Sequence, residues 1–212
     1  MAIKPILFNT EMVRAILDGR KTCTRRLVRF LPGENPQWTG YIRDGLMLYN
    51  GRNEPCIMKA PYQTGDILYV RETWCGLPVN EAGHMRGHTI YYYKADGELR
   101  PKGWRGTWHP SIHMPKEAAR IWLKVTDVRV ERLQECGEGW CLDIEKEGIV
   151  TPQNPILYIS DDAFHEALRL EFQKVWDSTI KKSDRDRYGW QANPYVWKIE
   201  FERCKKPKEA KT

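Results

Sequence analysis

The chain has 212 residues, 41% hydrophobic and 29% charged, which is the ordinary balance of a globular protein with a packed core. No stretch approaches the ~20 apolar residues of a membrane-spanning helix, and residues 1–5 do not begin a secretion signal, so we expect a cytoplasmic protein without membrane contact. The net charge of +6 gives a mild preference for polyanions.

The first third of the chain combines a helix, an extended segment and a loop-rich insertion. Residues 10–18 are predicted to form a helix that Thr10 caps and Gly19 ends. Within residues 20–27, β-branched residues stand at alternate positions, so this segment is predicted to be extended. Residues 31–64 are rich in Pro, Gly and Asn, and within them 41–48 indicates a hairpin that turns at Asp44-Gly45.

The middle of the chain is predicted to contain three strands. Residues 67–70 form an unbroken apolar run after a turn signal, which is typical of a strand buried on both faces. Residues 75–115 are expected to be loop apart from a strand at 90–93. Apolar residues alternate over 121–130, which predicts a long strand with a break.

The last third is predicted to contain two helices and a strand. A helix over 133–147 is weakened by two glycines, whereas 163–176 has a firm apolar stripe. A polar loop over 181–187 leads to a strand over 195–202, and the charged tail 205–212 is expected to be disordered. This mixed order of strands and helices predicts an α+β fold with a small curled sheet or barrel.

The densest group of chemically useful residues is the segment from Gly19 to Arg26. A lysine flanked by arginines is expected to have a lowered pKa, so Lys21 could act as a general base, with Thr22 or Thr24 as nucleophile. In a regular strand Lys21 and Thr24 point to opposite faces, so their cooperation requires a turn or bulge near Gly19. The alternative is a basic strand edge that contacts phosphate.

Two further segments are candidates for binding. The glycine-rich loop around Trp104 and Trp108 can stack on bases, or its rings can pack structurally. Residues 71–74 end the buried strand, and their charged side chains form either an ion pair or part of a pocket lining. The candidate binding residues are Arg20, Thr22, Arg25, Arg26, Arg71, Glu72, Trp74, Trp104 and Trp108.

The cysteines and histidines indicate neither disulfides nor a metal. The six cysteines follow no disulfide-framework spacing, so reduced thiols are expected. The pairs 84/88 and 109/113 have the i, i+4 spacing of helical ligands, but glycines interrupt the first and Pro110 the second. We therefore expect no metal and no cofactor.

Several separate motifs together resemble one family. Lys4 to Phe8, Met12 to Thr22 with Thr24 to Arg26, Gly65 to Trp74, Pro110 to Pro115 and Asn193 to Trp197 occur in the order seen in ASCH-domain proteins. The chain is similar over about residues 4–203 to the longer members found in phages and prophages. The resemblance implies a PUA-like small mixed β-barrel with flanking helices, in a single domain over 1–204 with long insertions at about 31–64 and 75–115.

The resemblance also implies an activity. Some compact ASCH proteins are amidohydrolases that remove the acetyl group from N4-acetylcytidine, with a catalytic lysine, threonine and glutamate. These fall on Lys21, Thr24 and, in a short helical stretch after the strands, Glu147. Lys21 would deprotonate Thr24, which attacks the amide carbonyl, while Glu147 handles the proton of the leaving amine or orients Lys21.

Three functions remain open at this level. The first is a hydrolase acting on an N4-acylated cytidine-type nucleoside or nucleotide. The second is a binding module without catalysis, which binds single-stranded RNA or a modified base through Arg20, Arg25, Arg26 and loop aromatics. The third, resting on the resemblance alone, is a phage protein that docks on a host or capsid partner.

Overall fold

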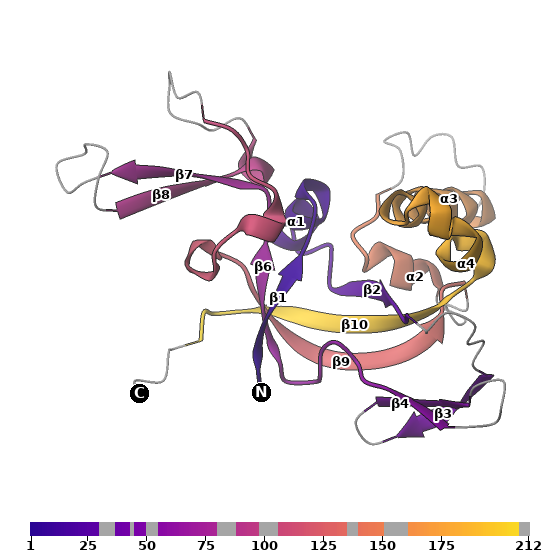
Figure 1. Cartoon of the computed structure of the whole chain (residues 1–212). Coiled ribbons are helices and arrows are strands. Elements are labelled where there is room, and N and C mark those ends of the chain that lie inside the picture. Colours follow the sequence, from indigo (N-terminus) through magenta and orange to yellow (C-terminus); the bar gives the residue numbers. More distant parts are fainter. Residues whose placement is uncertain are drawn as a thin grey trace. The chain divides into compact units, whose positions relative to one another are not determined.

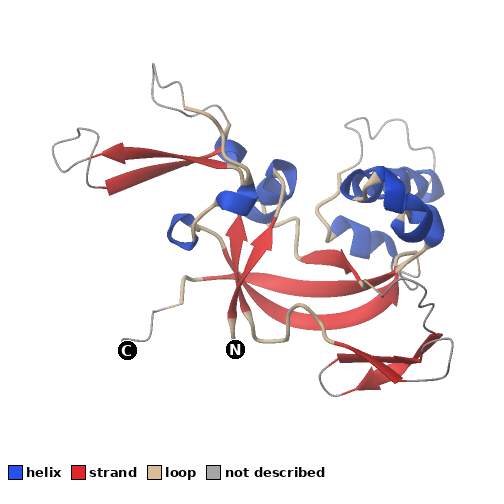
Figure 2. Cartoon of the chain, in the orientation of Figure 1, coloured by secondary structure: helices blue, strands red, loops and turns tan. Residues whose placement is uncertain are grey.

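The computed structural model describes residues 1–29, 37–42, 45–49, 55–79, 88–97, 106–134, 140–150 and 161–207, and for most of 37–58 the backbone alone. These residues form a mixture of helices and strands (Figure 2). The expected α+β class is confirmed. The chain divides into two compact units, and the prediction of a single domain stays a prediction. Unit one comprises Met1–Arg20, Gly65–Lys124 and Glu202–Thr212, and unit two comprises Lys21–Thr64 and Val125–Phe201.

Most of the helices and strands are labelled in Figure 1. Those of unit one are β1 (Ile3–Leu7), α1 (Thr10–Leu17), β6 (Ile67–Arg71), β7 (Trp74–Val79), β8 (His88–Tyr93) and the 3-10 turns η1 (Lys94–Asp96), η2 (Ser111–His113) and η3 (Lys116–Ala118). Those of unit two are β2 (Cys23–Leu27), β3 (Gln37–Ile42), β4 (Gly45–Tyr49), β5 (Pro55–Met58), α2 (Trp140–Glu145), α3 (Asp161–Thr179), η5 (Lys182–Asp184), α4 (Arg185–Tyr188) and η6 (Trp190–Ala192). Strands β9 (Trp122–Arg132) and β10 (Tyr195–Cys204) contain the boundaries between units.

The described strands form three sheets. Their orders are β1-β6-β9-β10-β2, β3-β4-β5 and β7-β8. In the largest sheet β1 runs parallel to β6, while β6 with β9 and β10 with β2 are antiparallel. Over the residues described, this sheet is not closed into a barrel, because β1 and β2 stand at its two ends.

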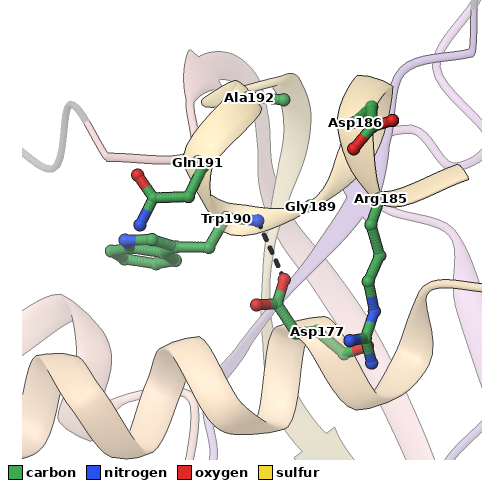
Figure 3. Close-up of a pocket in the computed structure, with 7 residues that line it drawn as sticks. All are labelled: Asp177, Arg185, Asp186, Gly189, Trp190, Gln191 and Ala192. Atoms are coloured by element: carbon green, nitrogen blue, oxygen red, sulfur yellow. Dashed lines mark hydrogen bonds between the residues drawn. The ribbon is translucent and has the colours of Figure 1, made fainter. Parts of the chain in front are cut away.

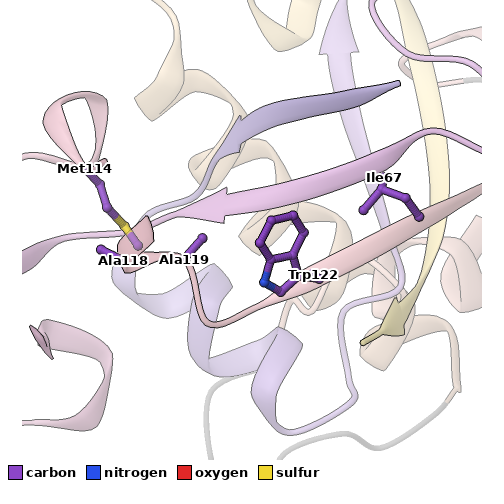
Figure 4. Close-up of a cluster of buried hydrophobic side chains, with 5 residues drawn as sticks. All are labelled: Ile67, Met114, Ala118, Ala119 and Trp122. Carbon is purple, nitrogen blue, oxygen red and sulfur yellow. The ribbon is translucent and has the colours of Figure 1, made fainter. Parts of the chain in front are cut away.

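The predicted buried strand is confirmed as β6. Leu68 and Val70 are fully buried, and Ile67 belongs to a cluster with Met114, Ala118, Ala119 and Trp122 (Figure 4). Beside it, buried Asp66 accepts hydrogen bonds from the Ala2 amide and the Lys4 ammonium, both at 2.8 Å. These bonds fix the start of β1 against the start of β6.

Helix α1 matches the predicted bounds to within one residue, but its N-cap differs from the predicted one. Asn9, not Thr10, is the N-cap, because its side chain accepts a hydrogen bond from the Met12 amide at 2.8 Å. At the other end Gly19 has φ 77°, and the Arg20 amide donates to the Ala15 carbonyl at 2.9 Å. This is a Schellman motif, which favours glycine at the left-handed position.

Two predictions for the middle of the chain were wrong. The region 75–115 is not loop outside 90–93, because Trp74–Val79 forms β7 and pairs with β8 along its whole length. Gly76 and Pro78 weakened the sequence signal of this strand, and Pro78 is tolerated because, among the described residues, β7 pairs with β8 alone beyond the bridge of Trp74 with His109. The break expected within 121–130 is absent, since β9 runs continuously over Trp122–Arg132. The hairpin predicted over 41–48 is confirmed by the antiparallel pairing of β3 with β4, but Gly45 pairs with Ile42 and so belongs to β4 rather than to the predicted turn.

The helices of unit two differ from prediction mainly at their ends. The helix expected from residue 133 begins at Trp140, since β9 extends to Arg132 and the Leu133 amide bonds to the Pro194 carbonyl. Helix α3 is confirmed and buries Leu168, Phe172 and Trp176 on one stripe. The predicted polar loop 181–187 instead contains η5 and most of α4. Residues 208–212 of the predicted disordered tail lie outside the described residues.

Candidate functional site

The basic segment singled out in the sequence divides at Arg20. Arg20 belongs to unit one, where its exposed guanidinium pairs with Asp18 at 2.9 Å. Lys21 opens unit two and is only 3% exposed. The predicted catalytic and basic residues from Lys21 to Arg26 therefore lie in one compact unit together with Glu147.

Lys21 and Glu147 form a buried pair. The Lys21 Nζ donates to Glu147 Oε2 at 2.7 Å and to the Glu147 backbone carbonyl at 2.8 Å, and the side chains are 1% and 6% exposed. The two residues also form a backbone bridge. The amides of Thr22 and Cys23 both bond to the Lys146 carbonyl, at 2.8 and 3.1 Å. These bonds fix the segment after α2 against the start of β2.

Arg25 joins this pair from the next part of β2. Its Nη1 donates to Glu147 Oε1 at 3.1 Å, while its Nε and Nη2 contact Glu131 Oε1 at 2.8 and 2.7 Å. The Arg25 side chain is 1% exposed, and its Cζ lies 5.6 Å from the centre of the Phe172 ring. Arg25 was predicted to bind nucleic acid, and this position favours a role inside the protein over a phosphate contact.

Lys198 is a charged residue of the site that the sequence did not single out. It lies directly across from Arg25 in the β10–β2 ladder, is fully buried, and forms an ion pair with Asp143. Two cations at facing positions repel each other, so the acids from α2 and β9 are needed to compensate. The available signal was Val196, an apolar residue on the same face of the predicted strand as Lys198.

Thr24, the predicted nucleophile, is buried on the other face of β2. Its exposure is 3%, and the register of β2 with β10 runs without a shift from Cys23 to Leu27. Successive residues of such a strand face opposite ways, so Thr24 points away from the face that carries Arg25. The irregular backbone expected near Lys21 is present before the strand, at Gly19.

The buried charges set the protonation of their neighbours. Burial alone raises the pKa of Glu147, but attraction by Lys21 and Arg25 and their hydrogen bonds outweigh it, so this pKa is lowered. Burial and, to a smaller extent, the Glu147 carboxylate raise the pKa of the Cys23 thiol to about 12, against the attraction of Arg25, Lys21 and Lys198. At neutral pH Glu147 is therefore ionised, and Cys23 is a neutral thiol rather than a nucleophile.

Arg26 and Thr22, the other candidate residues near Arg25, have different surroundings. Burial lowers the pKa of Arg26, against the attraction of Tyr62 and Glu147, and burial raises the pKa of Tyr62. Arg26 thus lies close enough to both residues to interact electrostatically. Thr22 is exposed, and its carbonyl accepts a hydrogen bond from the Phe201 amide at 2.9 Å.

The candidate residues at the end of β6 belong to unit one. Arg71 donates through Nε to the Met114 carbonyl at 2.8 Å and through Nη2 to the Ile112 carbonyl. Glu72, 1% exposed, accepts two bonds from Arg120 at 2.9 and 3.0 Å. Burial raises the pKa of Glu72, and the bonds from Arg120 oppose this rise. Both side chains therefore have partners within unit one, as expected of a structural role.

The aromatic candidates are also in unit one where they are described. Trp74 lies against His109 and Tyr91, with ring centres 5.1 and 5.8 Å apart, and its buried Nε1 has no hydrogen-bond partner. Trp108 is partly buried. Trp104 lies outside the described residues, so stacking by this loop stays a prediction.

A separate cavity of about 400 Å³ lies in unit two between the end of α3 and the turn formed by α4 and η6 (Figure 3). Its lining contains none of the predicted catalytic residues. Asp177 Oδ1 accepts a hydrogen bond from the Trp190 amide at 2.8 Å across its floor. The lining residues are Asp177, Arg185, Asp186, Gly189, Trp190, Gln191 and Ala192.

Neither a metal cluster nor a disulfide is found where the structure describes the side chains. Within this part of the chain no three His, Cys, Asp or Glu residues are grouped so as to hold a metal ion. Cys23, Cys75 and Cys204 are reduced thiols that are not joined in disulfides. None of the described helices is long and apolar enough to cross a membrane.

Comparison of the chain with protein-family models, with curated proteins and with solved structures gives no match.

Proposed function

We propose that this protein is an amidohydrolase that deacylates N4-acylated cytidine-type nucleosides without a metal, in the cytoplasm and on a PUA-like fold. The observation that carries the proposal is the buried contact of Lys21 with Glu147. The resemblance to ASCH proteins assigned catalytic roles to both residues, and 126 positions separate them in sequence. The mixed five-stranded sheet supports the fold assignment at the level of its class.

Burying three charged side chains is energetically unfavourable if their role is only structural. Lys21, Arg25 and Glu147 are each 5% exposed or less. Removing such ions from water costs several kcal/mol each, and buried ion pairs often contribute little net stability compared with apolar residues. Clusters of buried charges with shifted pKa values are common at active sites. This reasoning favours a chemical role for the pair.

The proposed reaction has two steps. The Lys21 ammonium first passes a proton to the Glu147 carboxylate, and the neutral amine then accepts the Thr24 hydroxyl proton while Oγ1 attacks the acyl carbon. The carbon–nitrogen bond breaks as Glu147 returns its proton to the departing cytosine amine. Water then hydrolyses the threonine ester and releases the carboxylic acid. Two acceptors of Glu147, the carboxylate and the backbone carbonyl, orient Lys21 Nζ. Thr24 faces away from Arg25, so direct attack by water is the competing route.

A deacylation assay tests this function. Wild type, Lys21→Ala, Glu147→Gln and Thr24→Ala are incubated with N4-acetylcytidine and other N4-acylated cytosine nucleosides in EDTA, and cytidine release is followed by mass spectrometry. We expect wild-type turnover, and at least a ~10²-fold loss in Lys21→Ala and Glu147→Gln, the usual contribution of a general acid or base. Lys182→Ala removes an exposed lysine and is the control.

The outcomes separate the alternatives. Absence of wild-type turnover on every acylated nucleoside contradicts the enzyme, and direct binding of single-stranded RNA and modified bases then tests the binding module. Turnover retained in Thr24→Ala but lost in Lys21→Ala assigns the nucleophile to water. Loss in all three variants supports the threonine route.

A further inference from the structure

Glu147 divides its two carboxylate oxygens between two cations. Oε2 accepts from Lys21 Nζ at 2.7 Å, and Oε1 accepts from Arg25 Nη1 at 3.1 Å. A carboxylate held at one oxygen only can rotate about its last side-chain bond, since that torsion is soft. A second donor on the other oxygen fixes the plane of the carboxylate and therefore the direction from which it meets Lys21.

We propose that Arg25 is a positioning residue, which holds Glu147 so that its Oε2 stays directed at Lys21. This inference rests on the proposed function, because it assigns Arg25 to the same site. Arg25 touches neither substrate nor reacting atoms in this scheme. It acts through Glu147 alone.

The guanidinium group suits this role better than an ammonium would. Arginine presents its donors in a rigid planar fork, and here the fork divides between two acids. Its Nε and Nη2 contact Glu131 on β9, while Nη1 reaches Glu147 after α2. A lysine has one nitrogen on a flexible stem and cannot reproduce both contacts with the same geometry.

Arg25 is itself held from several elements. Glu131 anchors it from β9, the Phe172 ring of α3 lies 5.6 Å from its Cζ, and Asp143 of α2 is 3.8 Å from Nη2. Its side chain is 1% exposed, so the orientation that it imposes on Glu147 is shielded from water.

The charges around Glu147 agree with this assignment. Among the described residues, Lys21 and Arg25 hydrogen-bond to it and Arg26 attracts it electrostatically, while Cys23, on the same strand face as Arg25, is a neutral thiol. Lys198, the next cation in the cluster, pairs with Asp143 instead. Loss of the Arg25 charge therefore leaves Lys21 to stabilise the Glu147 carboxylate, and the pKa of Glu147 rises.

A test independent of turnover uses carbon-13 NMR of labelled glutamate carboxyls, with the Glu147 signal assigned by its loss in Glu147→Gln. The titration of Glu147 is compared in wild type, Arg25→Gln, Arg25→Lys and Arg29→Gln, the last removing an exposed arginine just beyond the same strand. Arg25→Gln is expected to raise the midpoint by about 1–3 pH units, the effect of a close opposite charge. Arg25→Lys raises it less, and Arg29→Gln leaves it unchanged.

Kinetics on the acylated nucleoside supply the second readout. A misplaced carboxylate is expected to lower kcat by ~10–10²-fold in Arg25→Lys with little change in KM, because the charge is kept and only geometry is lost. A role in binding substrate phosphate would instead raise KM. Wild-type kcat in Arg25→Lys overturns the proposal.

The two proposals fail in different ways. If wild type shows no turnover, the hydrolase is wrong, and the Glu147 titration alone decides the role of Arg25. An unchanged Glu147 midpoint in Arg25→Gln overturns the positioning role whether or not the enzyme is active. If Arg25→Gln does not fold, Arg25→Met, which also removes the charge but keeps a long side chain, takes its place, and an unchanged midpoint there has the same meaning.

Discussion

Lys21, Arg25 and Lys198 show how much a residue's role depends on its neighbours. Each is a basic side chain on an extended segment, and each is almost completely buried. Buried cations are tolerated only when acids compensate them, and here Glu131, Asp143 and Glu147 do so from β9 and from the region of α2. A cluster that the sequence presents as a basic surface is therefore a balanced internal network.

The ionised state of Glu147 predicts how stability depends on pH. Since Lys21 and Arg25 lower the pKa of Glu147 in the folded protein, their contribution is present above the unfolded value of about 4.3 and is lost as pH falls through the folded value. Wild type should lose stability steeply below about pH 4. Glu147→Gln, although less stable at neutral pH, should show a flatter acid limb in urea unfolding measured between pH 3 and 7.

Glu145→Gln is the matched control, because Glu145 is an exposed acid at the end of α2, two residues before Glu147. Its unfolding free energy should follow the wild-type pH dependence. An acid limb in Glu147→Gln as steep as that of wild type would show that this carboxylate is not stabilised in the folded state. Asp143, whose pKa burial raises but the bond from Lys198 and the attraction of Lys198 and Arg25 lower overall, contributes in the same direction and remains in both variants.

At the scale of elements, the short helix α2 is fixed by its contacts rather than by its own length. It spans only Trp140–Glu145, far below the length at which an isolated helix is stable. It packs against α3, Asp143 pairs with Lys198, and the Lys146 carbonyl that follows accepts two amides from the start of β2. These contacts place Glu147, so the position of the candidate acid depends on three elements at once.

The turn between α4 and η6 depends on close backbone packing at Gly189. A Cβ at this position would lie 2.6 Å from the Arg185 carbonyl oxygen, although the backbone angles, φ −68° and ψ 173°, suit any residue. Gly189→Ala should therefore lower the free energy of unfolding by about 1–3 kcal/mol, as expected of overpacking. Urea unfolding monitored by tryptophan fluorescence would measure it.

Gln191→Ala provides the comparison, because Gln191 is an exposed residue of the same turn. Its effect should stay within about 0.5 kcal/mol, as for most surface substitutions. Equal stability of Gly189→Ala and wild type would mean that the turn relaxes to admit a methyl group at no cost.

At the scale of the whole molecule, net charge and local charge point to different partners. The net charge of +6 favours polyanions, yet Lys21, Arg25 and Lys198 are paired internally. Because acids neutralise these three charges inside the protein, they are not available to bind a phosphate backbone. This arrangement favours an uncharged nucleoside over a polymer as the substrate of the cluster.

Salt dependence distinguishes these partners. The KM for an N4-acylated nucleoside should be nearly unchanged between 50 and 200 mM salt, because no counterions are released. A protein that binds RNA through 6–10 phosphates loses ~10³-fold or more in affinity over that range. Steady-state kinetics and a fluorescent single-stranded RNA titration, run in the same buffers, provide the comparison. A steep fall in RNA affinity together with absent turnover would favour the binding module.

The sequence by itself determined the elements with strong local signals. These are the end of α1 at Gly19, the buried strand β6 and the apolar face of α3. They depend on the conformational preference of glycine and on the spacing of apolar residues along a strand or helix, and both act over a few residues. The sequence missed β7, whose Gly76 and Pro78 are tolerated in a strand of a two-stranded sheet, and it began α2 at residue 133, within the turn that follows β9.

Only the tertiary structure decided which charges meet. The resemblance identified Lys21 and Glu147, but their contact joins residues 126 positions apart, and nothing local encodes such a distance. The same holds for Arg25 with Glu131 and for Lys198 with Asp143. A lysine on a strand has the same local pattern whether its face meets water or an acid, so its role is fixed by the elements that pack above it.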